Sequence, residues 1–485
     1  MNPPWTAGHL PGLQDKDVAW HTLAFGPLAV RVPVLQPAQL QALARRVKEA
    51  GERELKTLPV SRIVEIVDAA IARLLDPQDP YRREAERLLP AISGYDPEMV
   101  KLGLNGFLQT FRAPQLHRFV AEDFPNPKVL DEFQPALKGG LVRAFGPGLL
   151  VHSWAGNVPA LPLWSLACGL LVKAGTVGKL PSAEPVFATL MARLLAEVHP
   201  PLADCIAIVW WKGGDEDSAR AVFREADTVL AYGGNEAIAQ LRAQVPVTTR
   251  FLGYGHKLGF GVIGRAALDA QRAPATARLA AHDIVRYEQQ GCYSPHQFFV
   301  QRGAKVAPRD FAQYLAAELA NLQQRFPRRA LALEEAAALA GWRQSRELQA
   351  LAGEGAEVIG DPHAAWSVAY GDRPQALAPT GGGRGILVCA IDRLDDVVPL
   401  VAPHAAFLQT AGVAVEPQEL LHLSVALGRA GVTRICALGA MTSPEAGWHH
   451  DGRFNLLDLV RMVEIEAGAE RASDLLAPYA QEPRP

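Results

Sequence analysis

Residues 148–180 read GLLVHSWAGNVPALPLWSLACGLLVKAGTVGKL. The apolar run at 148–154 has the length of a buried strand, and the glycine and proline residues after it indicate a tight loop. The next apolar stretch has the length of a helix, and a second short apolar run follows at 176–180. A strand, a loop, a helix and a second strand in this order predict a parallel βαβ unit whose strands are buried on both faces.

The same alternation continues toward the C-terminus. IAIVWW (206–211) and DTVLAYG (227–233) have the character of strands, and helix-like segments separate them: EPVFATLMARLLAEV, SARAVFREA and NEAIAQLRAQV. Short apolar strands that alternate with helices are typical of a doubly wound parallel sheet that binds a nucleotide. We therefore predict an α/β protein with a nucleotide-binding domain here.

The flanking regions differ from this domain. Residues 37–120 are predicted to be helical, since RIVEIVDAAIARLL (62–75) spaces its apolar residues three and four apart, and Asp96 with Pro97 form a cap and first-turn pair. Beyond residue 250, a second α/β domain is indicated by the strand-like runs FGVI, QFFVQ (297–301), GILVCAI (385–391) and TRICALG (433–439).

Composition excludes several classes of protein. With 485 residues, of which 49% are hydrophobic, the chain can bury large cores in roughly two to four domains. A net charge of −3 gives no electrostatic reason to expect nucleic acid as a partner. No charged residue occurs from 144 to 172, but prolines and glycines interrupt this stretch, so we expect no membrane span and, at the N-terminus, no signal peptide.

The five cysteines are scattered and never spaced as CxxC. This pattern favours a reduced, cytoplasmic protein without disulfides or a metal site. Four of them lie in apolar runs and are predicted to be inert: Cys168, Cys205, Cys389 and Cys436. Cys292 differs, because YEQQGCYSPH (287–296) places it in a polar turn between a helix and a strand. It is our candidate nucleophile, with an inert thiol as the alternative.

Polar and glycine residues at strand ends supply further candidates. Asn157 could donate to an oxyanion, or it could cap the helix that follows. Lys179 ends a predicted strand, where a cofactor ribose or phosphate would lie, although a solvated lysine is equally consistent. Gly233 and Gly234 permit close approach of a pyrophosphate or simply form a tight turn. GFGVIG (259–264) matches GxGxxG but lacks a preceding strand, so we interpret it as a glycine-rich strand.

Taken in order, GNVP (156–159), KLPS (179–182), YGGNEA (232–237) and the cysteine loop resemble the aldehyde dehydrogenase superfamily. Within it, four segments resemble the acyl-CoA reductase family, of the type of the fatty acid reductase subunit of bacterial luminescence. They are QQGCYSPH, GYDPEMVKLGLNGFLQTF, FLQTAGVAV (407–415) and HHDGRFNLLDLVR (449–461). The resemblance covers about residues 40 to 465.

The resemblance implies a role for each candidate. Cys292 matches the nucleophile that accepts the acyl group as a thioester, and Asn157 matches the oxyanion-hole amide, joined by the backbone N–H of Cys292. Lys179 matches the lysine that holds the adenine-side ribose. Gly233 and Gly234 match the turn beneath the pyrophosphate. By the same resemblance we expect residues 1–250 to form a helical region and an NAD(P)-binding domain, completed by 445–485, and residues 251–444 to form the catalytic domain.

Two departures from the superfamily bear on the chemistry. Oxidising aldehyde dehydrogenases carry a glutamate base in a segment like LELGGK, whereas this chain has LGYGHK (252–257), with Gly253 at the glutamate's place. A thioester protected from water suits a reductase, while His256 as a substitute base would suit an oxidising enzyme. Ser182 stands where NAD-preferring relatives have an acidic residue, so NADPH is favoured. Glu184 keeps NADH as the alternative cofactor.

We therefore predict an acylating oxidoreductase that reduces a long-chain fatty acyl-CoA, or an acyl group from a partner enzyme, to the aldehyde. The alternatives are an NAD(P)-dependent oxidising aldehyde dehydrogenase and a catalytically silent protein of the same fold. His450 and Asp451 could approach the active site, or Asp451 could cap a helix FNLLDLVRM. The superfamily implies a homodimer or homotetramer.

Overall fold

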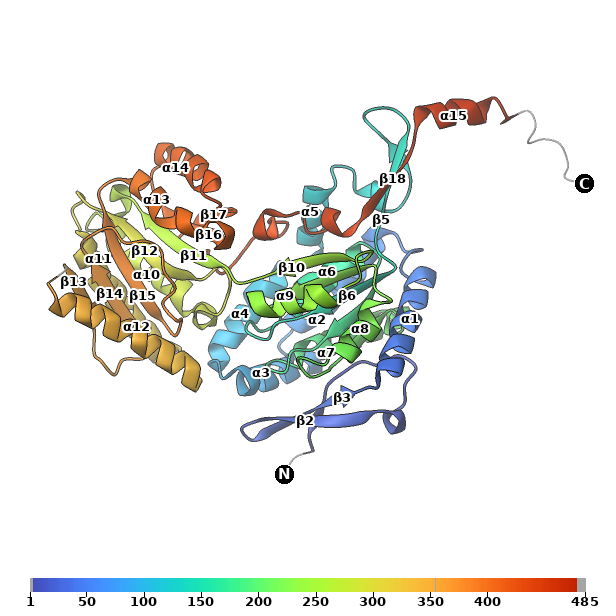
Figure 1. Cartoon of the computed structure of the whole chain (residues 1–485), viewed down its shortest axis with the longest axis horizontal. Helices are drawn as coiled ribbons and strands as arrows, with labels where there is room; N and C mark the ends of the chain where they lie inside the picture. The colour runs from blue at the N-terminus through green and yellow to red at the C-terminus, as the bar shows by residue number, and fades with distance from the viewer. Residues whose placement is uncertain (1–2, 354, 478–485) are drawn as a thin grey trace, which may run out of the picture.

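The computed structural model describes residues 3–353 and 355–477 and contains two large, mainly parallel sheets (Figure 1). The first has five parallel strands in the order β10-β9-β6-β7-β8. Its strands are β6 (Leu149–Ser153), β7 (Gly175–Lys179), β8 (Ile206–Val209), β9 (Thr228–Tyr232) and β10 (Arg250–Tyr254). Its connecting helices are α6 (Pro162–Leu171), α7 (Phe187–Val198), α8 (Glu216–Phe223) and α9 (Asn235–Gln244). The predicted doubly wound sheet is confirmed.

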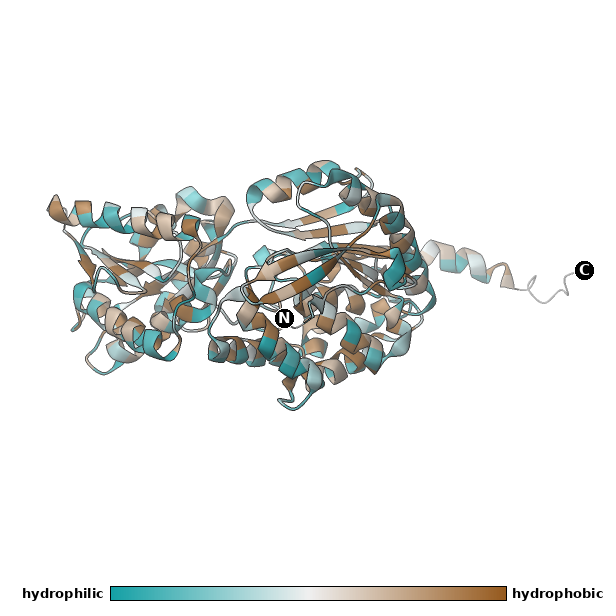
Figure 2. Ribbon diagram, turned by 90° about the horizontal axis from the view of Figure 1, so that it is seen from below, coloured by the Kyte–Doolittle hydropathy of each residue, from teal (hydrophilic) through white to brown (hydrophobic). Residues whose placement is uncertain are grey.

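Burial explains the uncharged stretch around residue 160. Every residue of β6, β8 and β9 is buried, and so are all residues of α6. Figure 2 shows the same pattern, with brown strands inside the molecule and helices that alternate brown and teal. Among residues 3–353 and 355–477, no helix is both long and apolar enough to cross a membrane.

Helices form the N-terminal region, as predicted for residues 37–120, and they pack against the first sheet, its connecting helices or one another. They are α1 (Pro37–Arg53), α2 (Val60–Leu75), α3 (Pro80–Ser93), α4 (Pro97–Gln109) and α5 (Ala113–Asp123). The carboxylate of Asp96 accepts from the backbone N–H groups of Glu98 and Met99, at 2.9 and 3.1 Å. The predicted cap at the start of α4 is therefore confirmed.

The second sheet has seven strands in the order β13-β14-β15-β12-β11-β16-β17, and only the edge strand β13 is antiparallel. The strands are β11 (Leu258–Ile263), β12 (Pro295–Gln301), β13 (Ala356–Ile359), β14 (Ser367–Gly371), β15 (Gly385–Ile391), β16 (Leu408–Ala414) and β17 (Arg434–Ala437). The helices that pack on it include α10 (Arg272–Val285), α11 (Pro308–Arg325), α12 (Leu333–Leu351) and α14 (Pro417–Arg429).

The GxGxxG match lies inside β11 and is a packed strand, as interpreted from the sequence. A Cβ added at Gly259 would lie 2.6 Å from the carbonyl oxygen of Ser294, and one at Gly261 would lie 2.2 Å from the ring of Phe298. These glycines allow neighbouring strands to approach each other, so they leave no room for a dinucleotide.

Two smaller sheets were not predicted. One contains β1 (Trp5–Thr6), β2 (Ala19–Phe25) and β3 (Leu28–Val34), and the other contains β4 (Gln134–Pro135), β5 (Leu141–Phe145) and β18 (Arg461–Ile465). β18 pairs antiparallel with β5, and with α15 (Ala467–Asp474) it forms an arm that projects from the body (Figure 1). The predicted helix FNLLDLVRM is wrong, because residues 457–459 form a single 3₁₀ turn before β18.

The chain passes between the large sheets through a short link. β10 ends at Tyr254 and β11 begins at Leu258, so only residues 255–257 connect them. The carboxyl edge of the first sheet thus faces the amino ends of β11, β12 and β16. The predicted domain division at residues 250 and 251 stays a prediction.

Candidate active site

The loop that carries Cys292 follows a turn of left-handed backbone. Tyr287, Glu288 and Gln289 have φ values of 52°, 53° and 60°, a conformation that costs roughly 1–3 kcal/mol for each non-glycine residue. Buried contacts hold the turn. The Glu288 carboxylate accepts from Arg384 at 2.7 and 2.9 Å, and the Gln289 amide donates to the carbonyls of Pro295 and Gly385. Cys292 is therefore presented by a fixed loop.

Cys292 lies between two cavities of about 600 and 530 Å³. We call them the apolar cavity and the glycine-lined cavity. Both are lined by Cys292 and by a shared wall of Val158, Leu161, Tyr232, Tyr293 and His450. The sulfur can thus be approached from two sides by two different molecules.

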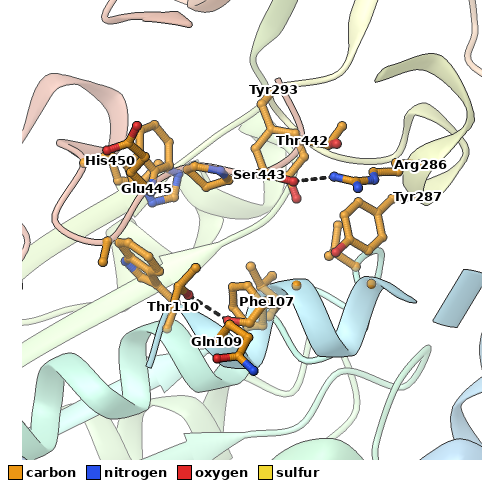
Figure 3. Close-up of a pocket in the computed structure, with 18 of the residues that line it drawn as sticks. Phe107, Gln109, Thr110, Arg286, Tyr287, Tyr293, Thr442, Ser443, Glu445 and His450 are labelled. Carbon is orange, nitrogen blue, oxygen red and sulfur yellow. Dashed lines mark hydrogen bonds between the residues drawn. The ribbon is translucent and has the colours of Figure 1, made fainter. Parts of the chain in front are cut away.

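α4 forms one wall of the apolar cavity, and polar side chains lie at its edge (Figure 3). Its walls include Phe107, Leu161, Trp164 and Tyr287. At the rim, Arg118 pairs with Glu445 at 3.0 Å, and Arg286 donates to the hydroxyl of Ser443. A cavity with apolar walls and a few rim charges can bind a hydrocarbon chain whose polar end remains near the sulfur.

The glycine-lined cavity is distinguished by six glycines in its lining. Gly233, Gly234, Gly255, Gly291, Gly381 and Gly382 line it. Gly234 precedes α9, and a Cβ added there would meet no protein atom within 4 Å. Open space beside the N-terminus of a ten-residue helix fits the pyrophosphate of a dinucleotide, because the free N–H groups and the helix dipole favour an anion.

Lys179 and Ser182 lie at the end of β7, away from the Cys292 cavities. The Lys179 ammonium is 6.0 Å from the centre of the Trp211 ring, and burial lowers its pKa. The Ser182 hydroxyl accepts from the indole N–H of Trp210 at 3.1 Å and is exposed. Their assigned roles at the adenine side stay predictions.

Glu184 points into the protein instead of toward Ser182. Its carboxylate accepts from the N–H groups of Val186 and Phe187, each at 2.9 Å, at the start of α7. Burial raises its pKa to about 7. A side chain that is 2% exposed and bonded to a helix start is poorly placed to bind a ribose.

Asn157 lines the glycine-lined cavity and caps no helix. α6 begins at Pro162 with Leu161 as its N-cap, so the alternative interpretation of Asn157 as a cap is wrong. The Asn157 amide donates to the carbonyl of Gln290 at 2.6 Å, and the Tyr95 hydroxyl donates to the carbonyl of Asn157 at 2.8 Å. The amide therefore lies against the Cys292 loop, and its oxyanion role stays a prediction.

The sulfur of Cys292 contacts a residue that the sequence did not single out. The side-chain N–H of Gln409, on β16, donates to this sulfur at 3.3 Å and to the Asp451 carboxylate at 2.6 Å. Burial raises the pKa of the Cys292 thiol to about 11, and the Gln409 bond acts in the opposite direction. The signal in the sequence that could have identified Gln409 is a glutamine within an apolar strand, where it is fully buried.

The HHDG segment reaches the same place. His450 lines both cavities and stacks on Tyr254 with ring centres 4.4 Å apart, and burial lowers its pKa to about 4. Asp451 has a φ of 54° and lies 3.8 Å from the Lys257 ammonium. His256 lines the glycine-lined cavity, and its backbone N–H donates to Asn235. These residues lie around the glycine-lined cavity, and Asp451 caps no helix.

A side chain at Gly253, the place of the glutamate base, would not face either cavity. A Cβ there would lie 2.7 Å from Ile238 of α9 and 2.9 Å from the Phe251 ring, and Gly253 lines neither cavity. Its φ is not left-handed, so backbone freedom does not explain the glycine either. Tyr254 lines the cavity in its place. Within the described chain, Asp451 is the one carboxylate lining that cavity.

Comparison with known proteins finds similar sequences along most of the chain. A family model described as acyl-CoA reductase (LuxC) matches residues 55–462. The long-chain acyl-protein thioester reductase of Vibrio harveyi is 27% identical over 417 residues, which cover 85% of this chain and 84% of the relative. The enzyme of the same name from Photorhabdus luminescens is 26% identical over 461 residues, which cover 93% of this chain and 90% of the relative.

Solved aldehyde dehydrogenases share the fold. KauB from Pseudomonas aeruginosa matches with a TM-score of 0.73 at 13% identity, over 96% of both chains. Aldehyde dehydrogenase 21 from Physcomitrella patens matches with a TM-score of 0.71 at 12% identity, over 96% of this chain and 98% of that one. At this identity the likeness concerns the fold alone.

Proposed function

This chain belongs to the acyl-CoA reductase (LuxC) family, and from that membership we propose that it reduces a long-chain acyl group, held as a thioester on Cys292, to the aldehyde with NADPH. The observation that carries the proposal is the position of Cys292 in a wall shared by two cavities that are otherwise lined by different residues. One suits an acyl chain and the other suits a dinucleotide.

The acyl donor is a thioester or another activated acyl group. The relatives are named for acyl-protein thioesters, which supports an acyl group delivered by a partner protein, while the family description supports acyl-CoA. Both donors would present the same reactive carbonyl to Cys292. The apolar cavity would bind the hydrocarbon chain in either case.

Acyl transfer begins when the Cys292 thiolate attacks the carbonyl carbon. A carbon–sulfur bond forms, the carbonyl oxygen becomes negatively charged, and the donor leaves as a thiol that takes up the proton lost by Cys292. The Asn157 amide and the backbone N–H of Cys292 would donate to this oxygen, an effect worth roughly 3–4 kcal/mol per donor. NADPH, when bound, would supply a hydride to the thioester carbonyl, and Cys292 would then leave as a thiolate and free the aldehyde.

The residues present fit such a cofactor. Gly233 and Gly234 would hold the pyrophosphate at the start of α9, and Lys179 would hold the ribose next to the adenine. Ser182 is exposed and would lie near the 2′ position of that ribose, whereas Glu184 is turned inward. Because Glu184 is poorly placed to bind a ribose, NADPH is favoured over NADH.

The lining of the glycine-lined cavity supports reduction over hydrolysis. Tyr254 is part of that lining, and a phenol stacked on Tyr232 is a poor base for activating water. One observation favours an oxidising aldehyde dehydrogenase as the second candidate, since His256 lines the same cavity and could take a proton.

We also propose a cytoplasmic homo-oligomer. All five cysteines are free thiols, which supports a reducing compartment. The arm of β5 and β18 projects from the body, β17 is an edge strand, and α14 exposes Leu421 and Val425. An edge strand beside exposed apolar residues favours contact with a second copy, which light scattering would test.

The test of the reaction is incubation with a long-chain acyl-CoA, or an acyl-protein thioester, and NADPH. Loss of NADPH with equal formation of aldehyde is expected. Formation of fatty acid from added aldehyde and NADP⁺, without the reductive reaction, would establish the oxidising enzyme instead. No turnover with any of these substrates would contradict both.

A further inference from the structure

We infer that Gln409 is a catalytic residue that donates a hydrogen bond to the sulfur of Cys292 and that Asp451 is the positioning residue that orients it. The inference rests on the proposed nucleophilic role of Cys292 and adds a second group acting on the same atom. It also gives the HHDG segment a role, since Asp451 caps no helix.

Hydrogen bonds hold both the nitrogen and the oxygen of the Gln409 side-chain amide. Its nitrogen donates to the Cys292 sulfur at 3.3 Å and to Asp451 at 2.6 Å, and its oxygen accepts from the Thr410 hydroxyl at 3.3 Å. Its backbone carbonyl accepts from the N–H of Thr433 at 3.1 Å. The side chain is fully buried on β16, so it has no solvent to turn toward.

Asp451 decides which end of the amide faces the sulfur. A carboxylate only accepts hydrogen bonds, so the NH₂ group of Gln409 must face it, and the second hydrogen of that group is free for the sulfur. Reversing the amide would put its oxygen against both the carboxylate and a thiolate. The contact with Asp451 therefore selects the orientation in which Gln409 can stabilise negative charge on sulfur.

The thiolate forms twice in the proposed reaction. It is the attacking form of Cys292, and it is also the leaving group when the aldehyde is released. Burial disfavours it, and so does the Asp451 charge, whereas the Gln409 N–H favours it. One donor at the sulfur would therefore assist both acylation and product release.

Other titratable and charged groups lie near the sulfur, but the Gln409 side chain is the one that donates a hydrogen bond to it in the described chain. They include Lys257, Arg434, His256, His450, Tyr232 and Tyr293. Burial keeps His450 and both phenols neutral at neutral pH. Lys257 lies beside Asp451, and Arg434 donates to the carbonyls of Ala440 and Met441.

The test measures alkylation of Cys292 by iodoacetamide against pH, with peptide mass spectrometry to separate this thiol from the other four. It uses the full chain and needs neither acyl donor nor cofactor. In Gln409→Met, which keeps the volume but removes the donor, the apparent pKa is expected to rise by about one unit, with about tenfold slower alkylation at neutral pH.

Gln301→Met is the matched control, because it removes a buried glutamine from β12, which β11 separates from β16 in the same sheet, without touching Cys292. Its alkylation profile is expected to equal that of the wild type. If Gln409→Met fails to fold, Gln409→Asn keeps a buried amide that is one methylene too short to span both the sulfur and Asp451, and the same upward shift is expected.

Reductase activity gives the second readout. Loss of the donor should depress turnover at neutral pH and allow recovery as pH rises, whereas a merely structural defect would depress it at every pH. An unchanged alkylation profile in a folded Gln409 variant would overturn the inference. Failure of the proposed function would be seen separately, as reduction that persists in Cys292→Ala.

Discussion

The two cavities beside Cys292 are built from different parts of the chain. Side chains form the apolar cavity, which takes Phe107 from α4 and Trp164 from α6. Six glycines help to line the glycine-lined cavity, among them Gly233, Gly234 and Gly255. Bulky apolar side chains can enclose a hydrocarbon chain, whereas glycines let a charged ligand approach the backbone closely.

Because different residues line the two cavities, the specificity for the acyl chain and the affinity for the cofactor can change independently. A substitution in the apolar cavity should change which acyl chains bind and leave the cofactor alone, and the reverse should hold on the other side. Only residues of the shared wall and of the Cys292 loop should affect both. Each prediction below tests that separation.

Cys292→Ala should have the largest effect, because it removes the one atom that both ligands must reach. Acyl-enzyme formation and reduction should both be abolished, while NADPH affinity stays nearly unchanged, since the cavity walls remain. Intact-mass analysis and fluorescence titration with NADPH would measure the two properties. A stable acyl adduct on the variant would show that another residue is the nucleophile.

Asn157→Ala should lower kcat by about 10²–10³ through loss of one oxyanion donor. Because Asn157 caps no helix, its melting temperature should change little. Steady-state kinetics and thermal unfolding would be measured on the same preparation. Near-normal kcat with a clear loss of stability would instead mean that the bond to the Gln290 carbonyl is the residue's main role.

Tyr254→Glu should place a carboxylate in the cavity that contains Cys292 and let water reach the thioester. Hydrolysis of acyl-CoA without NADPH should rise by up to about 10², the lower end for a well-placed base, and aldehyde yield should fall. Gly253→Glu is the matched control, because its side chain would collide with Ile238 and Phe251 outside the cavity. It should lose stability and gain no hydrolysis.

A folded Tyr254→Glu variant with an intact thioester would contradict this account of the missing base. Rapid loss of the wild-type thioester in buffer would also contradict it, and would favour His256 as the base of an oxidising enzyme.

Gly253 and Tyr254 show what the sequence could not predict, namely which of two adjacent residues of β10 points toward the cavity. Side chains alternate across a strand, so a shift of one residue moves a position to the opposite side of the sheet. Counting along LGYGHK placed the critical position at Gly253, yet in β10 this residue points at α9. The inferred feature is a strand position without a carboxylate, and it holds whether that position is Gly253 or Tyr254.

The parallel strands were predictable because burial on both faces leaves an uninterrupted apolar run, as in β6 and β9. The segment FNLLDLVRM has helical spacing, but the Asp123 carboxylate accepts from the N–H groups of Leu456 and Leu457. That contact joins residues more than 300 positions apart, so no local pattern contains it. The bond from Gln409 to Cys292 was missed for the same reason.

The smallest expected effects come from a pair of glycines, one in each cavity. Gly106 of α4 lines the apolar cavity and Gly234 lines the glycine-lined one, and a Cβ at either would meet no protein atom within 4 Å. A leucine at either position can therefore enter open space without displacing the protein. The fold should tolerate both substitutions, and the two differ only in which ligand they obstruct.

Gly106→Leu should weaken binding of long acyl donors by about fourfold for each methylene that it displaces, at about 0.8 kcal/mol per CH₂. Short acyl donors should be unaffected, and so should the Kd of NADPH. Gly234→Leu should show the reverse, a raised Kd for NADPH with an unchanged rate of Cys292 acylation. Measuring KM across acyl chain lengths together with NADPH affinity compares the variants directly. If Gly106→Leu weakened NADPH binding, or if it weakened short and long donors equally, the two cavities would not be separate sites for separate ligands.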